Sequence, residues 1–152
     1  MNWRRTCKAL RSIKIRALLD TNVFIYAYEI PDSNSNIIIK ALNRSLFEAI
    51  ITELTFKVYR YFRKHYSKRL ADAFRIYLFA VCKIVFSQQL GEHFTKYARL
   101  VNEKDLEQVV AVREFGIKYL VSYDKHFESI EEYRTPKQFA EFLGLQTYPV
   151  NY

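Results

Sequence analysis

The segment IRALLDTNVFIYAYE, residues 15–29, changes character at Asp20. The apolar run before Asp20 is typical of a short strand, and apolar residues return at helical spacing after Thr21 and Asn22. The pattern predicts a strand, a polar junction in which Thr21 and Asn22 cap the next element, and a helix that ends near Glu29. Asp20 is therefore expected at the carboxyl end of the strand.

A second segment repeats this arrangement. IKYLVSYD, residues 117–124, has strand character and ends in another carboxylate, Asp124. KIVFS, residues 83–87, is typical of a short buried strand, and helical patterns separate the strands. Strands that alternate with helices form parallel sheets covered on both faces. We expect an α/β fold, a three-layer α/β/α sandwich around a central, mainly parallel sheet of about four or five strands.

Helical periodicity and capping residues delimit the segments between these strands. PDSNSN, residues 31–36, predicts a loop, and residues 37–50 favour a helix, although the run Ile37–Ile39 also suits a strand. The other expected helices, with their caps and stops, are 52–68 with Thr52 as cap, 69–82, 91–101, 102–116 with Asn102 as cap and Gly116 as stop, and 135–144 with a Thr cap, a Pro at its first position and a terminal Gly.

The composition limits size and class. At 152 residues and 50% hydrophobic, the chain suits one domain over residues 1–152, with a basic N-terminal extension over residues 1–14. No apolar run approaches the roughly 20 residues that span a bilayer, and no signal-peptide cleavage site is recognisable. Cys7 and Cys82 form no ligand pair. These features predict a soluble, cytoplasmic protein with no membrane partner, and the net charge of +8 favours an anionic partner such as nucleic acid.

Four acids are expected at one edge of the sheet. Asp20 and Asp124 end strands, while Glu53 and Asp105 lie in the opening turns of helices that begin on that same edge. Converging carboxylates repel one another unless a cation lies between them, and hard oxygen ligands suit Mg²⁺ or Mn²⁺. Taken singly, each acid is also explained as a helix-terminal or loop residue. The set of four favours a metal site.

These motifs resemble, in order and spacing, those of the PIN-domain nucleases, which include toxins of prokaryotic toxin–antitoxin pairs. LLDTNVFIY resembles the opening motif, ITELTFKVYRYF the second, and KDLEQVVAVREFGIKYLVSYDKHF the third and fourth together. The resemblance runs from about residue 15 to residue 143. One departure is SYDKHF, where Lys125 and His126 stand in place of a second acid that many relatives carry.

The resemblance implies a PIN-like fold and a metal-dependent endoribonuclease that hydrolyses phosphodiester bonds of single-stranded RNA. It implies Asp20, Asp105 and Asp124 as ligands of Mg²⁺ or Mn²⁺, with Glu53 binding through water or positioning the attacking water. Asn22 and Ser122 are implied as supports of the carboxylates or phosphate contacts; a simple cap and a strand-end hydroxyl explain them equally well. A toxin role further implies an antitoxin protein and a homodimer as partners.

Basic residues form a stripe after Glu53. Lys57, Arg60 and Lys64 lie at i, i+3 and i+7 and are predicted to guide a nucleic-acid backbone; a solvated helix face is the alternative. The other enzyme classes fit poorly, because three Gly exclude a phosphate-binding glycine loop and three separated His lack zinc spacing. Two further hypotheses remain from the sequence: an RNA-processing nuclease without antitoxin, and a non-catalytic nucleic-acid-binding module on the same fold.

Overall fold

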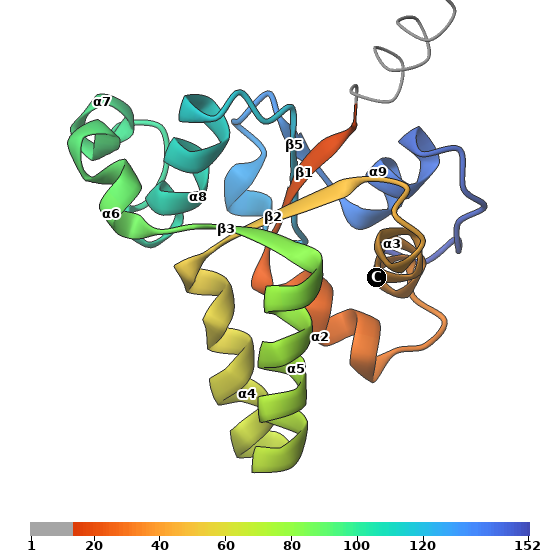
Figure 1. The fold of residues 1–152 in the computed structure, drawn as a ribbon. Helices are drawn as coiled ribbons and strands as arrows, with labels where there is room; N and C mark the ends of the chain where they lie inside the picture. Colours follow the sequence, from red (N-terminus) through yellow and green to blue (C-terminus); the bar gives the residue numbers. More distant parts are fainter. Residues whose placement is uncertain (1–13) are drawn as a thin grey trace, which may run out of the picture.

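Five short parallel strands form the central sheet in the computed structural model, which describes residues 14–152. The strands are β1 (Arg16–Leu19), β2 (Glu48–Thr52), β3 (Cys82–Val85), β4 (Tyr119–Val121) and β5 (Tyr133–Arg134), in the order β3-β2-β1-β4-β5 (Figure 1). Every neighbouring pair is parallel. Cys7 and residues 1–13 of the predicted basic extension lie outside the described residues.

Helices cover both faces of this sheet. One face carries α2 (Thr21–Glu29), α3 (Asn34–Asn43), α4 (Lys57–His65), α5 (Lys68–Val81) and α9 (Pro136–Phe142). The other carries α6 (Ser87–Leu90), α7 (Phe94–Tyr97) and α8 (Glu103–Glu114). Short 3₁₀ turns complete the chain: η1 (Glu53–Phe56), η2 (Gly91–His93) and η3 (Lys125–Phe127). The predicted three-layer α/β/α architecture with a parallel sheet is confirmed.

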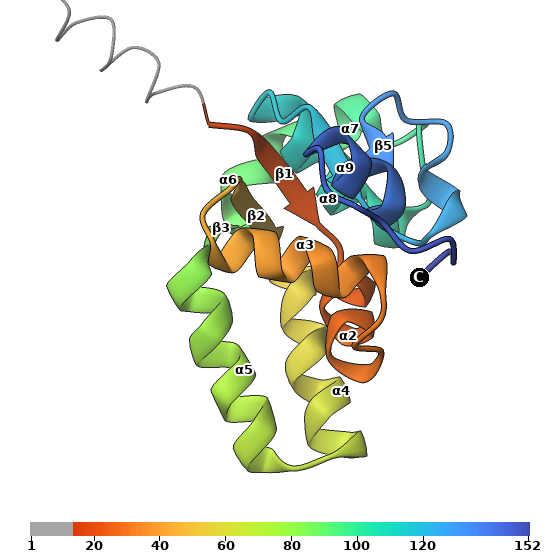
Figure 2. The ribbon, with the colours of Figure 1, turned by 90° about the vertical axis from the view of Figure 1, so that its right-hand side faces the viewer.

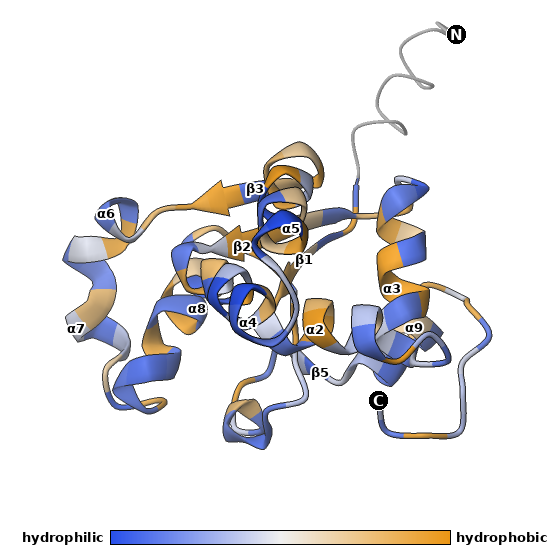
Figure 3. Cartoon of the chain, turned by 90° about the horizontal axis from the view of Figure 1, so that it is seen from below, coloured by the Kyte–Doolittle hydropathy of each residue, from blue (hydrophilic) through white to orange (hydrophobic). Residues whose placement is uncertain are grey.

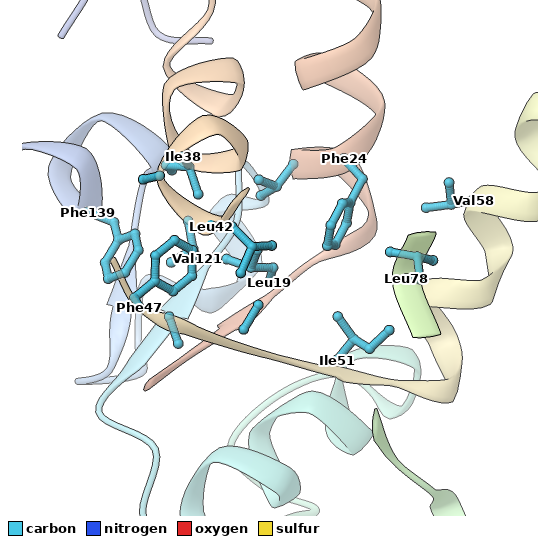
Figure 4. Close-up of a cluster of buried hydrophobic side chains, with 14 of the residues drawn as sticks. Leu19, Phe24, Ile38, Leu42, Phe47, Ile51, Val58, Leu78, Val121 and Phe139 are labelled. Carbon is cyan, nitrogen blue, oxygen red and sulfur yellow. The ribbon is translucent and has the colours of Figure 1, made fainter. Parts of the chain in front are cut away.

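Side-chain alternation along the strands builds two cores. In β1, Ala17 and Leu19 point to the α2 face and Leu18 to the α8 face. On the α2 face, Phe24, Phe47 and Phe139 are among the fully buried residues (Figure 4). Phe47 and Phe139 meet edge to face with ring centroids 5.1 Å apart. Burial on both faces explains why the inner residues of the central strands β1, β2 and β4 are apolar.

The capping signals place two helices where the sequence predicts them. Thr135 caps α9 by accepting from the Gln138 backbone N–H, and Pro136 is the first helical residue. Gly116 and Gly144 adopt φ of 61° and 76°, the left-handed conformation that ends helices. Asn102 precedes α8 as predicted, although its side chain makes no capping hydrogen bond.

Five expectations were wrong in detail. The predicted helix over 52–68 is shorter, because Glu53–Phe56 form η1 and α4 begins only at Lys57, and the Thr52 side chain makes no capping hydrogen bond. The predicted loop at 31–36 is shorter, because the Ser33 side chain accepts from the Asn36 backbone N–H and starts α3 at Asn34. The predicted helix over 37–50 ends at Asn43, and a turn containing Ser45, with φ 58°, leads into β2. The segment 91–101 folds as separate short turns rather than one helix. Asp20, not Thr21 or Asn22, caps α2 by accepting from the Thr21 backbone N–H.

The helical hairpin of α4 and α5 projects from the sheet (Figures 1 and 2). Val58 and Phe62 bury its inner face, and the rings of Phe62 and Phe74 lie 4.7 Å apart. Tyr66, which lies four residues after Phe62, is 48% exposed because α4 ends at His65. Hydrophilic residues colour much of α4 in Figure 3. Among residues 14–152, no helix has the length and apolar character of a membrane span.

The C-terminal segment is held by one buried side chain, Asn34. Its amide nitrogen donates to the carbonyls of Tyr148 and Val150, at 3.3 and 3.0 Å, and its amide oxygen accepts from the Tyr148 backbone N–H at 2.8 Å. The Asn34 backbone N–H also donates to the Tyr152 carbonyl at 2.8 Å. The last residues are thereby tied to the start of α3.

Asn34→Ala is expected to lower the free energy of unfolding by about 2 kcal/mol, because it removes the three hydrogen bonds that the buried Asn34 side chain makes to the backbone of Tyr148 and Val150. Urea unfolding measures the loss, and carboxypeptidase should trim the variant faster. Asn151→Ala, at an exposed position of the same segment, is the control. Unchanged stability and unchanged trimming in Asn34→Ala would contradict this assignment.

Candidate active site

The site lies where the strand order reverses. From β1 the chain builds outward through β2 and β3, then returns to the other side of β1 with β4. Ligands of open α/β sheets bind beyond the carboxyl ends of the strands at such a point. Because Leu19 pairs with Val121, the residues that follow the two strands, Asp20 and Ser122, come side by side, and the Asp20 backbone N–H donates to the Val121 carbonyl at 3.0 Å.

Three donors hold the Asp20 carboxylate. Oδ1 accepts from the Thr21 backbone N–H at 2.8 Å and from Gln108 Nε2 at 2.7 Å, while Oδ2 accepts from Ser122 Oγ at 2.6 Å. Gln108 and Ser122 are both buried. Hydrogen bonds from three separate donors fix the orientation of the carboxylate. The sequence did not identify Gln108, although it lies three residues after Asp105 and therefore on the same side of α8.

Ser122 joins the two predicted supporting residues to the carboxylates. Its Oγ donates to Asp20 and accepts from the Asp124 backbone N–H at 2.9 Å. The Asn22 side chain lies beside it, with Nδ2 3.4 Å from Ser122 Oγ and Oδ1 3.4 Å from the Tyr123 backbone nitrogen. Asn22 and Ser122 therefore fix the loop that carries Asp124.

Asp105, in the first turn of α8, is the strained member of the site. The residue is 8% exposed, and its Oδ2 is buried without a hydrogen-bond partner within residues 14–152. Burial, and then the charges of Asp124 and Asp20, raise the pKa of Asp105. An ionised, unpartnered buried oxygen beside other carboxylates is the environment that a divalent cation stabilises. The donor set thus fits a bound metal ion.

Asp124 and His126 complete this group. The Asp124 carboxylate accepts from the His126 backbone N–H at 2.9 Å and caps η3. His126 Nδ1 lies 3.1 Å from Asp124 Oδ1 and 3.6 Å from Asp105 Oδ2. One ligand atom from each of Asp105, Asp124 and His126 lies within 4.8 Å of the others.

The acids open onto a cavity of about 260 Å³ at the surface. It is lined by Asp20, Thr21, Asn22, Ile25, Leu54, Lys57, Lys104, Asp105, Gln108 and Asp124. Lys57 and Lys104 are exposed, so two ammonium groups border the carboxylates. Lys104 had no distinguishing signal in the sequence. A larger hollow, of about 710 Å³ next to α9, contains none of these acids.

Glu53 stands apart from the other predicted acids. It opens η1, and its carboxylate accepts from the Ser87 backbone N–H at 3.0 Å and from Ser87 Oγ at 3.2 Å. The same hydroxyl lies 2.7 Å from Glu107 Oε1. Glu53 does not line the 260 Å³ cavity, so the structure joins Asp20, Asp105 and Asp124 and leaves Glu53 in a neighbouring contact.

The predicted basic stripe diverges along α4. Lys57 lines the acidic cavity, and Arg60 borders a separate groove with Phe56, Tyr59, Arg75 and Phe79. Lys64 is exposed near the end of the helix. Only the first residue of the stripe therefore lies at the carboxylates.

Similar folds occur among solved structures, for example in the two proteins that follow. A chain of the Rickettsia felis VapBC2 complex, solved bound to a DNA fragment from its promoter, has a TM-score of 0.54 and 16% identity, covering 80% of this chain and 98% of its own. Mycobacterium tuberculosis VapC20, a sarcin–ricin loop cleaving toxin, has a TM-score of 0.56 and 14% identity, covering 76% of this chain and 97% of its own. The chain has a PIN-like fold. No family model and no curated protein matches its sequence, so the likeness concerns the fold.

Asp105→Asn is expected to raise the melting temperature of the cation-free PIN-like chain at pH 7 by about 2–4 °C, equal to roughly 1 kcal/mol. The raised pKa means that the folded chain holds the Asp105 proton more tightly than the unfolded chain. Wild-type stability therefore falls as pH rises from about 3.9 through the raised pKa, and the advantage of the variant shrinks below that window.

Thermal unfolding in EDTA across a pH series measures this difference. Asp32→Asn, which neutralises an exposed carboxylate, is the matched control. A variant less stable than wild type at pH 7, or a difference that does not change with pH, would contradict the assigned strain at Asp105.

Proposed function

We propose that this chain is a divalent-cation-dependent endoribonuclease that hydrolyses phosphodiester bonds of single-stranded RNA. The observation that carries the proposal is the meeting of Asp20, Asp105 and Asp124 at one cavity bordered by Lys57 and Lys104. Converging carboxylates suit a bound divalent cation, and such a cation can contact a phosphate of the substrate. The flanking lysines suit the neighbouring phosphates. The PIN-like fold shared with the VapC toxins supports the same reaction class.

Asp105 and Asp124 would hold the cation, which is Mg²⁺ or Mn²⁺ in this proposal, with Asp20 as a ligand or near-ligand. When bound, such an ion lowers the pKa of water and offsets charge on the phosphate. No side-chain nucleophile is needed. Gln108, Ser122 and Thr21 fix the Asp20 carboxylate before substrate arrives, so that little reorganisation is required during the reaction.

Glu53 has a different proposed role. Ser87 holds its carboxylate beside the acidic cavity rather than in it. We therefore propose that Glu53 binds the cation through a water molecule or positions the attacking water. Lys57 and Lys104 are proposed to bind the phosphates on either side of the scissile bond, and Arg60 and Lys64 to guide the strand further along α4.

The proposed biological role is that of a toxin held inactive by an antitoxin protein, in the cytoplasm where RNA is available. The support is that the similar structures include a VapBC2 complex and the toxin VapC20. A homodimer is proposed with it. A processing nuclease would share the site and the chemistry but would need no antitoxin.

Wild-type protein is expected to cleave labelled single-stranded RNA with Mn²⁺ or Mg²⁺ and to lose activity in EDTA. Asp20→Asn should abolish cleavage, and Ser122→Ala should lower it about 10–100-fold, because it frees both Asp20 and the Asp124 loop. Glu53→Gln should lower cleavage while leaving Mn²⁺ binding intact. Asp32→Asn should cut at the wild-type rate.

The same assay with single-stranded DNA of matching sequence tests the choice of RNA. The contrary result is that wild type and Asp20→Asn bind RNA equally, without metal and without cleaving it. That result would contradict the nuclease proposal and favour a non-catalytic nucleic-acid-binding module.

Lys57→Gln is expected to weaken RNA binding and to reduce the salt dependence of log K by about 0.7, the contribution of one phosphate contact on a single strand. Fluorescence anisotropy over a range of salt concentrations, with Asp20→Asn as the background to prevent cleavage, gives the slope. Lys83→Gln is the control, because Lys83 pairs with Glu48 at 2.8 Å near the start of β2, at the opposite edge of the sheet from the acids. An unchanged slope in Lys57→Gln would contradict a phosphate contact.

A further inference from the structure

His126 faces the two carboxylates with a ring nitrogen. Nδ1 lies 3.1 Å from Asp124 Oδ1 and 3.6 Å from Asp105 Oδ2, and the side chain is 58% exposed. Ligand atoms that are adjacent around one ion lie about 3 Å apart when each bond is about 2.1 Å long. Both distances from the ring nitrogen are therefore close to the spacing of neighbouring ligands of one cation, and one ligand atom from each of the three residues lies within 4.8 Å of the others.

The backbone fixes His126 at this place. Asp124 caps η3 by accepting from the His126 backbone N–H, and the Phe127 backbone N–H donates to the Asp124 carbonyl at 3.2 Å. Phe127 is fully buried, so it anchors the turn in the α8-side core. The imidazole thus projects from a short rigid turn whose cap is itself one of the acids.

A simple ion pair does not explain the group. Asp105 Oδ2 is buried without a hydrogen-bond partner within residues 14–152, and 3.6 Å is too long for a hydrogen bond from His126 Nδ1. The unpartnered oxygen of Asp105 thus lies in one group with the His126 ring nitrogen and an Asp124 oxygen, and one ligand atom from each residue lies within 4.8 Å of the others. The missing partner of Asp105 Oδ2 is evidence for a ligand that does not depend on the number of acids.

We propose that His126 supplies an imidazole nitrogen ligand, which makes the cation site a mixed nitrogen and oxygen site that prefers Mn²⁺ to Mg²⁺. The inference rests on the proposed function, since it concerns the same cation. Imidazole suits transition-metal ions, whereas carboxylate, carbonyl and water suit Mg²⁺. The ligating form of His126 carries its proton on Nε2 and offers the Nδ1 lone pair to the ion.

Direct metal binding, without substrate, tests the proposal on the full chain. Free Mn²⁺ is counted by electron paramagnetic resonance, Mg²⁺ is measured by competition, and pulsed electron paramagnetic resonance detects nitrogen coupled to bound Mn²⁺. His126→Asn should raise the Mn²⁺ dissociation constant about tenfold or more, with a change below about twofold for Mg²⁺, and should remove the nitrogen coupling. His126→Asp should lower the preference for Mn²⁺ over Mg²⁺.

His93→Asn is the matched control. His93 also faces a carboxylate, with Nδ1 3.5 Å from Glu114 Oε2, but it lies in η2, outside the group formed by Asp105, Asp124 and His126. It should bind both ions as wild type does and keep the nitrogen coupling. Circular dichroism checks that the variants are folded, as expected for replacements of an exposed side chain.

The outcomes separate this inference from the proposed function. Suppose that Mn²⁺ binds wild type and not Asp105→Asn, but shows no nitrogen coupling and no dependence on His126. That result contradicts His126 as a ligand and leaves the nuclease proposal intact. Binding of neither ion by wild type, or binding that survives both Asp105→Asn and Asp124→Asn, overturns the cation site and the inference with it.

Discussion

The parallel pairing of β1 with β4 is the constraint on which the site depends. It joins segments about a hundred residues apart and places Leu19 opposite Val121, so the chain must release Asp20 and Ser122 together at the sheet edge. The hydrogen bond between them, at 2.6 Å, continues the pairing from backbone to side chain. A change of register by one residue would turn the strand side chains to the opposite faces and separate these two groups.

Two carboxylates in one cavity meet opposite environments. Asp20 accepts three hydrogen bonds that fix its carboxylate, whereas Asp105 is buried with an oxygen that has no partner within residues 14–152. The hydrogen bonds make the Asp20 carboxylate rigid, and the unpartnered Asp105 oxygen is free to bind a cation. The unpartnered Asp105 oxygen destabilises the cation-free fold, and in the proposed function it binds a cation. A protein selected only for stability would pair or remove that charge.

Much of this arrangement could be predicted from the sequence, because the signals were local. Asp20 and Asp124 end apolar runs, and Thr135 and Gly144 bracket α9 with unambiguous capping residues. The strand β2 was missed because residues 37–51 contain no Gly or Pro to mark the turn between α3 and β2. Gln108 was missed because α8 is buried on nearly all sides, so its polar residues follow no amphipathic pattern. The partner of Glu53, Ser87, is 34 positions away, a contact that only the folded chain defines.

The central claim is that the carboxylates at this edge of the sheet bind a divalent cation. Diffraction from crystals soaked in Mn²⁺, recorded where manganese scatters anomalously, tests it most directly. The account predicts one strong anomalous peak within bonding distance, about 2.1–2.3 Å, of Asp105 and Asp124 oxygens, beside the ordered Asp20 carboxylate. A fully soaked crystal without a peak between these residues, or with its manganese bound elsewhere on the chain, would contradict the account.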